Sequence, residues 1–279
     1  MVNKKAKLCL NMIVKDEEHV IEETLKCMTK YIDYYVIVDT GSTDNTKSVI
    51  KNYFDSVNIK GEIHDVPWKN FGYNRTKALE LCRGKAEYCW VIDADDIIVG
   101  NLVLPEVMDK GHYCLIYGND FSYHRGQIFK VDNNWRYEGV LHEYPAHSSK
   151  DNSMGVIKGD YYMDSRRLGS RNKVGDKYER DIKIFLEALK EEPNNERYHF
   201  YLAQSYMDNK EYEKSNEWYL KRFKMGGWPE EMYYSLYKIG SNNIKLEKST
   251  EIIEGSLFSA WMFRKSRLEA LFELVEYLH

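Results

Sequence analysis

The chain has 279 residues, with 44 acidic and 40 basic side chains and a formal net charge of −4. At roughly 150 residues per domain, this length predicts two domains, each large enough to bury a hydrophobic core. Hydrophobic residues make up 43% of the chain, which excludes a disordered protein. Proteins that bind nucleic acid mainly through phosphate contacts have a basic excess, so we expect no nucleic-acid partner.

The five cysteines are odd in number and form no Cys-x-x-Cys pair. This argues against a disulfide framework and a zinc ribbon, and it favours a reducing compartment. No segment approaches the roughly 18 consecutive apolar residues of a membrane span. The basic N-terminus leads into a short apolar run that Asn11 interrupts, which does not fit a signal peptide. We therefore expect a cytoplasmic protein.

Strands and helices alternate over the first 100 residues. Short apolar runs predict strands, and apolar side chains at helical spacing predict helices between them. Such alternation is typical of a parallel sheet covered by helices. The predicted strands span 8–14, 35–38, 63–66 and 88–92, and the predicted helices span 17–31, 41–54 and 73–82.

The pattern changes in the second part of the chain. Residues 111–163 hold short β-like runs and turn residues, which predict antiparallel or mixed strands added to the sheet. From about residue 176 the pattern is helical, with a spacing of apolar residues that resembles a tetratricopeptide repeat. We therefore predict an α/β domain at 1–170 and a tetratricopeptide-like all-α domain at 171–279. The residues at repeat packing positions are Leu202, Ala203, Tyr206, Tyr212 and Tyr219.

The last predicted helix ends at His279 without a polar cap. This predicts an edge that pairs with a second copy of the chain, as a homodimer, or a native protein that continues further. Stacks of helical repeats present concave surfaces that bind peptides, so an acceptor or partner that is a protein or an extended glycan fits this half of the chain.

Acidic side chains follow three of the predicted strands. Asp16 and Glu17 follow the first strand, and Asp39 ends the second. Asp93 and Asp95 follow the fourth strand, where alternation in an extended chain would place both carboxylates on the same side. Ligands of an open parallel sheet bind beyond the carboxyl ends of its strands, so these groups should meet in one crevice and require a cation. The alternative is that each acid only caps a helix or faces solvent.

Four segments of the first half occur together in a characteristic order. They read LCLNMIVKDEEHVIEETL, VIVDTGSTDNT, FGYNRTKALELC and WVIDADD. Over roughly residues 7–100 the chain resembles a family 2 glycosyltransferase of the GT-A fold, which has a Rossmann-like mixed sheet. Two later segments, WRYEGVLHEYP and RRLGSRNK, resemble a subgroup in which tetratricopeptide repeats follow the catalytic domain.

The resemblance implies an inverting transfer of one sugar from a nucleotide-diphosphate donor, most often a UDP-sugar, by a hexosyl- or N-acetylhexosaminyl-transferase. Asp39 would bond the nucleobase. The backbone at Met12–Val14 and the side chain of Glu17 would line the nucleotide pocket. Arg75 matches a family position that faces the nucleotide.

The resemblance also implies a metal. Asp95 would bind Mn²⁺ or Mg²⁺, and Asp93 would contact the ribose or a metal-bound water. The cation would offset the charge of the departing diphosphate. His142 is a candidate for a third metal ligand or for orienting the acceptor; the alternative is a hydrogen-bonded loop histidine.

An inverting transfer needs a base for the acceptor hydroxyl. Many family members carry an acidic residue well after the Asp-x-Asp motif, and the best match here is Glu143, with Asp120 and Asp164 as weaker candidates. The alternative role for Glu143 is a structural salt bridge.

A basic segment lies near Gly169 and Gly175. Its Arg167 and Arg171 would close over the diphosphate as a loop, or the segment would be a solvated linker. The chain lacks the Q-x-x-R-W motif of processive synthases, which favours transfer of one sugar per encounter.

Two other functions fit parts of the pattern. A sugar nucleotidyltransferase also uses carboxylates and a metal at the end of a sheet, but it has a glycine-rich loop after its first strand, which this chain lacks. The second alternative function is that of a non-catalytic helical-repeat adaptor with a degenerate transferase domain. Retention of Asp39, Asp93 and Asp95 together argues against such decay.

Overall fold

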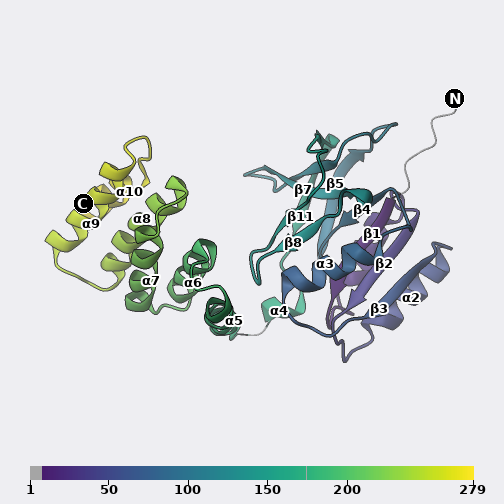
Figure 1. Cartoon of the computed structure of the whole chain (residues 1–279), viewed down its shortest axis with the longest axis horizontal. Helices are drawn as coiled ribbons and strands as arrows, with labels where there is room; N and C mark the ends of the chain where they lie inside the picture. Colours follow the sequence, from purple (N-terminus) through teal and green to yellow (C-terminus); the bar gives the residue numbers. More distant parts are fainter. Residues whose placement is uncertain (1–7, 174) are drawn as a thin grey trace. The chain divides into compact units, whose positions relative to one another are not determined.

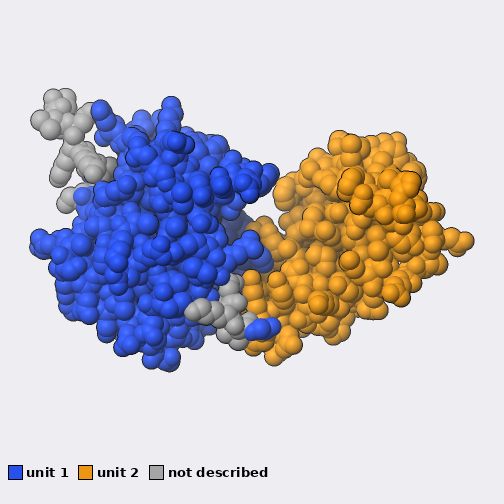
Figure 2. Space-filling view, turned by 180° about the vertical axis from the view of Figure 1, so that it is seen from behind, with its two compact units in different colours: residues 1–175 blue, residues 176–279 orange. Residues whose placement is uncertain are grey.

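The computed structural model describes residues 8–173 and 175–279 and divides the chain into two compact units, 1–175 and 176–279 (Figures 1 and 2). The first unit combines a mixed sheet with helices, and the described part of the second unit is helical. The predicted fold class, an α/β unit followed by an all-α region, is confirmed. Across the described ranges, no helix combines the length and the apolar character that crossing a membrane requires.

Four parallel strands form one half of the sheet in the first unit. Their positions match the four strands that the sequence predicts, to within a few residues. The register places Val14 opposite Asp39, and Asp39 opposite Asp65, so the carboxyl ends of neighbouring strands meet at one edge. These strands are β1 (Leu8–Val14), β2 (Tyr34–Asp39), β3 (Gly61–Asp65) and β4 (Tyr88–Val91), in the order β3-β2-β1-β4.

The sheet continues beyond β4 with strands of mixed direction. In residues 8–173 it has nine strands, and the path runs on from β4 through β7, β6 and β11 to β5, with β10 paired to β6. A separate two-stranded sheet joins β8 to β9. The bounds are β5 (Asp96–Val103), β6 (His112–Tyr117), β7 (Tyr123–Lys130), β8 (Arg136–Glu138), β9 (Tyr144–Ala146), β10 (Met154–Val156) and β11 (Lys158–Ser165).

Four of these strands, β5, β8, β9 and β11, match no apolar run that the sequence offered. β5 has a partly exposed face and contains Gly100, so its sequence lacks the continuous apolar run of a buried strand. Gly100 has a φ of 89°, and a Cβ there would lie 2.2 Å from the carbonyl oxygen of Asp160. The glycine that weakens the sequence signal is therefore what lets β11 approach.

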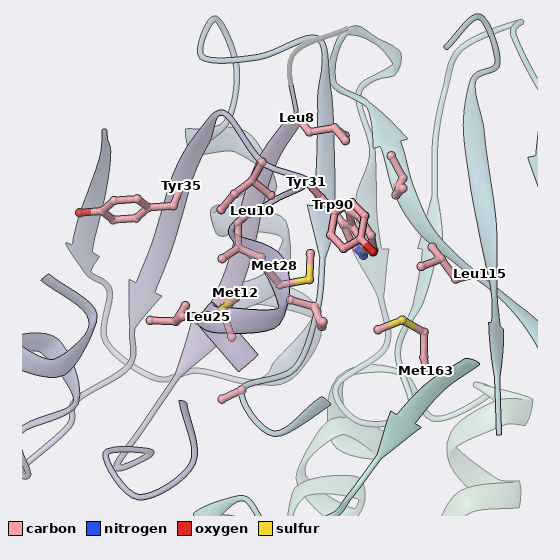
Figure 3. Close-up of a cluster of buried hydrophobic side chains, with 14 of the residues drawn as sticks. Leu8, Leu10, Met12, Leu25, Met28, Tyr31, Tyr35, Trp90, Leu115 and Met163 are labelled. Carbon is pink, nitrogen blue, oxygen red and sulfur yellow. The ribbon is translucent and has the colours of Figure 1, made fainter. Parts of the chain in front are cut away.

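Helices cover both faces of the sheet. Alternate residues of β1 point to opposite faces, as a strand requires. Leu10 and Met12 pack with Leu25 and Met28 of α1 in the larger core (Figure 3), whereas Cys9 belongs to the smaller core under α3. The helices of this unit are α1 (Ile21–Met28), α2 (Thr46–Ser56), α3 (Phe71–Leu81) and the short α4 (Ser170–Lys173).

The second unit is a series of antiparallel neighbours in which each helix packs against the next. Its polar contacts are specific: the Ser215 hydroxyl of α7 donates to the carbonyl of Ala203 in α6 at 2.9 Å. The tetratricopeptide assignment stays a prediction. The helices are α5 (Lys177–Glu191), α6 (Glu196–Asp208), α7 (Tyr212–Lys224), α8 (Pro229–Lys245), α9 (Thr250–Phe263) and α10 (Glu269–Leu278).

Arg222→Ala should destabilise the helical unit. Arg222 is fully buried, and its guanidinium lies 3.0 Å from Glu231 Oε2 and 3.2 Å from Glu196 Oε2. Removing one partner of a buried ion pair leaves an uncompensated charge, at a cost of about 3–5 kcal/mol. Thermal unfolding of the whole chain, followed by circular dichroism at a helical wavelength, measures the loss.

Lys214→Ala is the matched control, because the Lys214–Glu211 pair of the same helix is solvent-exposed. Exposed pairs contribute up to about 1 kcal/mol. Equal shifts for the two variants would contradict a structural role for the buried pair.

Candidate active site

Asp39 ends β2, and only one of its two carboxylate oxygens has a hydrogen-bond partner among the described residues. The residue is 2% exposed, and its Oδ1 accepts the N–H groups of Gly41 at 2.9 Å and Ser42 at 2.8 Å. Oδ2 is buried and has no hydrogen-bond partner among the residues that the structure describes. A buried carboxylate oxygen without a partner is costly. Oδ2 is therefore a ready acceptor for an N–H group of a ligand.

The loops after β1 and β2 are bonded to one another. Asp16 has a φ of 56°, and its Oδ1 accepts the N–H of Thr43 at 2.6 Å. The N–H of Glu17 donates to Thr46 Oγ1 at 2.7 Å, and Asp44 Oδ1 accepts the N–H of Thr46 at 2.9 Å. Asp16 and Asp44 thus hold the loops through backbone N–H groups, and the predicted helix at 17–31 begins only at residue 21 because these bonds fix the preceding turn.

The Asp-Ala-Asp run forms a turn, which corrects the prediction that alternation places both carboxylates on the same side. β4 ends at Val91, and the carbonyl of Asp93 accepts the N–H of Asp96 at 3.2 Å. Period-two alternation requires an extended chain, so it does not apply here. The two carboxylates have different partners: Asp93 bonds Arg75, and Asp95 bonds the backbone of Gly169.

Arg75 bridges the candidate base and the first aspartate of the motif. Its Nη2 lies 2.5 Å from Asp93 Oδ1, and its Nε lies 2.7 Å from Glu143 Oε1. Burial alone would raise the pKa of Asp93, but the Arg75 guanidinium holds it below its usual range. The salt bridge considered for Glu143 is therefore present. Contact of Arg75 with a nucleotide stays a prediction.

The start of α3 brings Arg75 to Glu143. Asn70 Oδ1 caps the helix by accepting the N–H of Tyr73 at 2.8 Å. The N–H of Phe71 donates to the carbonyl of Val140 at 3.2 Å. A Cβ on Gly72 would lie 2.2 Å from the carbonyl oxygen of Gly139, so only glycine allows this approach.

Asp96, the residue after the Asp-Ala-Asp run, holds the turn through buried hydrogen bonds. It is 2% exposed and begins β5. Its Oδ2 accepts the Tyr117 hydroxyl at 3.1 Å, and its Oδ1 accepts the Ser165 hydroxyl at 2.9 Å. Burial, reinforced by the charge of Asp93, raises the pKa of Asp96 to about 7.

Residues 166–171, here named the basic strap, lie against the candidate ligand carboxylates. The N–H of Gly169 donates to Asp95 Oδ2 at 2.9 Å, and the N–H of Ser170 donates to Glu17 Oε1 at 3.2 Å. The Arg171 guanidinium lies 4.6 Å from the Phe71 ring centroid. Burial raises the pKa of Glu17 to about 7, and the charge of Asp95 adds to the shift. The basic strap therefore covers Glu17 and Asp95 at the carboxyl ends of β1 and β4.

The donor set fits a hard divalent cation that is shared with a substrate. In the described part of the chain, no three His, Cys, Asp or Glu side chains gather to hold a metal by themselves. Glu17 and Asp95 are neighbours, since a Cβ on Gly169 would lie 3.2 Å from Glu17 Oε1 and 3.5 Å from Asp95 Oδ2. Mg²⁺ sites commonly use one or two carboxylates plus phosphates of the substrate. His142, with a φ of 50°, precedes Glu143, and its role as a ligand stays a prediction.

The structure thus gathers the predicted residues in two groups along one edge. One group contains Glu17, Asp95 and the strap, and the other contains Asp93, Arg75 and Glu143. Met12–Val14 run beside β2, so Val14 lies next to Asp39. The φ of Arg167, 55°, places it at a bend of the strap.

Arg125 is the residue near the site that the sequence reasoning missed. Its Nη2 lies 4.0 Å from Asp93 Oδ2. The start of β7 is polar and shows no apolar alternation, so the sequence pattern does not single out Arg125. No signal in the sequence points to it, because its place beside Asp93 depends on the antiparallel pairing of β7 with β4.

Comparison with known proteins decides the family. Residues 9–154, more than half of the chain, match the family model described as glycosyl transferase family 2. The chain belongs to this family. Its first unit is the family 2 glycosyltransferase domain, of the GT-A fold, that the resemblance implied. Family membership argues against the nucleotidyltransferase.

Among curated proteins, this family 2 glycosyltransferase is 25% identical over 205 residues to the SPbeta prophage-derived glycosyltransferase SunS of Bacillus subtilis, covering 69% of this chain and 47% of SunS. It is 30% identical over 103 residues to the lipopolysaccharide core biosynthesis glycosyltransferase LpsC of Rhizobium meliloti, covering 36% and 35% of the two chains. The chain therefore spans about half the length, or less, of the curated relatives it matches.

Among solved structures, S. aureus TarS 1–349 in complex with UDP-GlcNAc superposes with a TM-score of 0.44 and 16% identity, covering 92% of this chain and 88% of that one.

Proposed function

We propose that this enzyme transfers one sugar, with inversion, from a UDP-sugar to a hydroxyl group of a glycan or protein, with Mn²⁺ or Mg²⁺. The observation that carries the proposal is the row of acids along the strand ends. It starts at the unpartnered Oδ2 of Asp39, passes Glu17 and Asp95, and ends at Asp93 and Glu143. A nucleotide-diphosphate sugar offers an N–H group, a diphosphate and a reacting carbon in the same order.

The nucleoside would bind over β1 and β2. Asp39 Oδ2 would accept the imide N–H of uracil, which is a hydrogen bond to a charged group in a buried place. Met12–Val14 would form the wall beside it, since Val14 pairs with Asp39 across the ladder.

The diphosphate would bind over Glu17 and Asp95. A cation held there with the phosphates supplies Lewis-acid stabilisation of the leaving group. In the structure both carboxylates accept N–H groups of the strap. Donor binding would replace these two bonds, and the released strap would bring Arg167 and Arg171 to the diphosphate.

Glu143 would act as the base. It would take the proton of the acceptor hydroxyl while the acceptor oxygen bonds the anomeric carbon and the bond to the diphosphate breaks on the opposite face. Arg75 would hold Glu143 in place through the 2.7 Å bond from its Nε to Oε1.

Asp39→Asn should weaken UDP binding by about 10- to 100-fold. The amide oxygen can keep the bonds to Gly41 and Ser42, so the turn survives. The amide NH₂ then replaces Oδ2 and faces the uracil N–H donor to donor, which leaves a buried donor unsatisfied at about 1–3 kcal/mol. Isothermal titration of UDP in the presence of Mn²⁺ measures this.

Wild-type protein that binds neither UDP nor a UDP-sugar in this titration would disprove the proposed donor. Asp55→Asn, an exposed acid on α2, is the control and should bind UDP like the wild type.

A further inference from the structure

Arg125 lies beside the row of acids but has no part in the transfer described above. β7 runs antiparallel to β4, with Trp90 opposite Ile128. The ladder does not extend to Asp93, because β7 bulges between Gly126 and Ile128 and β4 ends at Val91. Arg125 reaches the motif through its side chain, whose Nη2 lies 4.0 Å from Asp93 Oδ2. The guanidinium therefore lies at the strand edge, one strand beyond the Asp-Ala-Asp turn.

A buried polar layer holds the guanidinium. It lies over the Tyr117 ring, 5.2 Å from the centroid. With the Gln127 amide oriented to satisfy both of its groups, its oxygen accepts Arg125 Nε at 3.0 Å and its nitrogen donates to the carbonyl of Val91. The Tyr117 hydroxyl lies 2.8 Å from the same Gln127 oxygen and 3.1 Å from Asp96 Oδ2, so its one proton has two acceptors. Tyr117 and Gln127 are almost fully buried, and burying polar groups costs free energy unless they form hydrogen bonds with one another.

This layer fixes one edge of the guanidinium and leaves the other available. Asp93 Oδ1 already bonds Arg75 at 2.5 Å, whereas Arg125 stays 4.0 Å from Oδ2, which is too far for a hydrogen bond. The Arg125 side chain is 39% exposed. A pre-organised, partly exposed arginine fork is suited to bind paired oxygens of a ligand.

The charge around this fork is balanced. Arg75 and Arg125 carry two positive charges, and Asp93 and Glu143 carry two negative charges. Asp96, with a pKa of about 7, is a further acid that faces Arg125, so no positive excess remains to attract an anionic ligand. The oxygens that fit are those of an uncharged group, such as the hydroxyls of a neutral sugar.

The sheet order shows which part of the donor reaches Arg125. Asp39 ends β2, Glu17 follows β1, Asp95 follows β4, and Arg125 lies on β7, the next strand. A UDP-sugar laid along this edge from Asp39 places the uracil first, the diphosphate next and the sugar last. We propose that Arg125 determines sugar specificity by donating hydrogen bonds to the hydroxyls of a neutral transferred sugar. This inference rests on the proposed function.

The test compares Arg125→Gln and Arg125→Lys with the wild type. The probes are UDP, UDP-glucose, UDP-galactose, UDP-GlcNAc and UDP-glucuronic acid, each with Mn²⁺. Titration gives the affinities, and slow hydrolysis gives kcat/KM. We expect UDP affinity within threefold of wild type in both variants. The ratio of kcat/KM between the preferred sugar and the next should fall at least tenfold, and the extra affinity of that UDP-sugar over UDP should disappear.

Lysine should not restore the selectivity, because it is a point charge without the planar fork. Arg136→Gln, on the exposed face of β8, is the control and should keep the wild-type ratios. Circular dichroism confirms that each variant is folded, and Arg125→Lys preserves the charge if glutamine disturbs the layer beneath.

Three results would overturn the proposal. Unchanged sugar ratios would mean that Arg125 does not contact the sugar. An equal loss for UDP and for every UDP-sugar would mean that it acts only through Asp93. A wild-type preference for UDP-glucuronic acid would contradict the assignment of a neutral sugar to Arg125. If the wild type binds UDP but the sugar ratios do not depend on Arg125, this inference fails and the proposed function stands. If the wild type binds neither UDP nor a UDP-sugar, both the inference and the proposed function fail.

Discussion

Asp95→Ala should lower the hydrolysis of a UDP-sugar by at least about 1,000-fold and remove the effect of Mn²⁺ on donor binding. A metal that stabilises the charge of the leaving group contributes several kcal/mol, and about 4 kcal/mol corresponds to this factor. The fold should persist, because the side-chain bond that is lost is a single one, from the N–H of Gly169, worth about 1 kcal/mol. Titration of UDP with and without Mn²⁺, together with hydrolysis rates, measures both effects.

Asp55→Ala serves as the control, since this acid is exposed and far along α2 from the strand ends. Hydrolysis by Asp95→Ala at the wild-type rate, at ordinary metal concentration, would contradict the metal assignment. Loss of UDP affinity in Asp95→Ala even without metal would instead assign Asp95 to direct contact with the nucleotide.

The parallel half of the sheet is the part of the fold that sequence patterns predict well. β1 and β2 are buried on both faces, so their sequences are mostly apolar. β5 and β11 escape prediction for the opposite reason: they pair with each other at the sheet margin, where one face is exposed and Gly100 allows close contact. Local sequence cannot show that an irregular strand is completed by a partner about 60 residues later.

The candidate site shows the same division. Asp39, Asp93 and Asp95 could be predicted because each directly follows a recognisable strand. The direction of each carboxylate could not, since the turn after β4 depends on a backbone bond between residues 93 and 96.

Contacts between distant segments were also beyond the sequence. The amides of Gly169 and Ser170 reach Asp95 and Glu17 across more than 70 residues. Arg125 reaches Asp93 only through the antiparallel pairing of β7 with β4. These contacts come from pairing between strands and loops, to which spacing along the chain gives no guide. The same contacts fix where the acidic side chains and Arg125 lie relative to one another.

Glu143→Gln should lower turnover by about 100- to 10,000-fold, the usual contribution of a general base, while UDP affinity stays within threefold. Glutamine keeps the shape of the side chain, and its amide oxygen can still accept the Nε of Arg75, so the link from Arg75 to Asp93 survives. What is lost is the capacity to take a proton. In hydrolysis, water replaces the acceptor hydroxyl and needs the same base, so the rate of UDP-sugar hydrolysis measures the effect.

The control is Glu138→Gln, because Glu138 is close to Glu143 in the sequence, at the end of β8, but pairs with the exposed Arg136. Turnover of Glu143→Gln equal to wild type would assign Glu143 to the salt bridge alone and move the base to Asp120 or Asp164. A fall in UDP affinity equal to the fall in turnover would mean that the Arg75 bridge, rather than proton transfer, is what Glu143 supplies. A fall in turnover alone requires that a carboxylate, held by Arg75 at the end of the row of acids, accepts the proton.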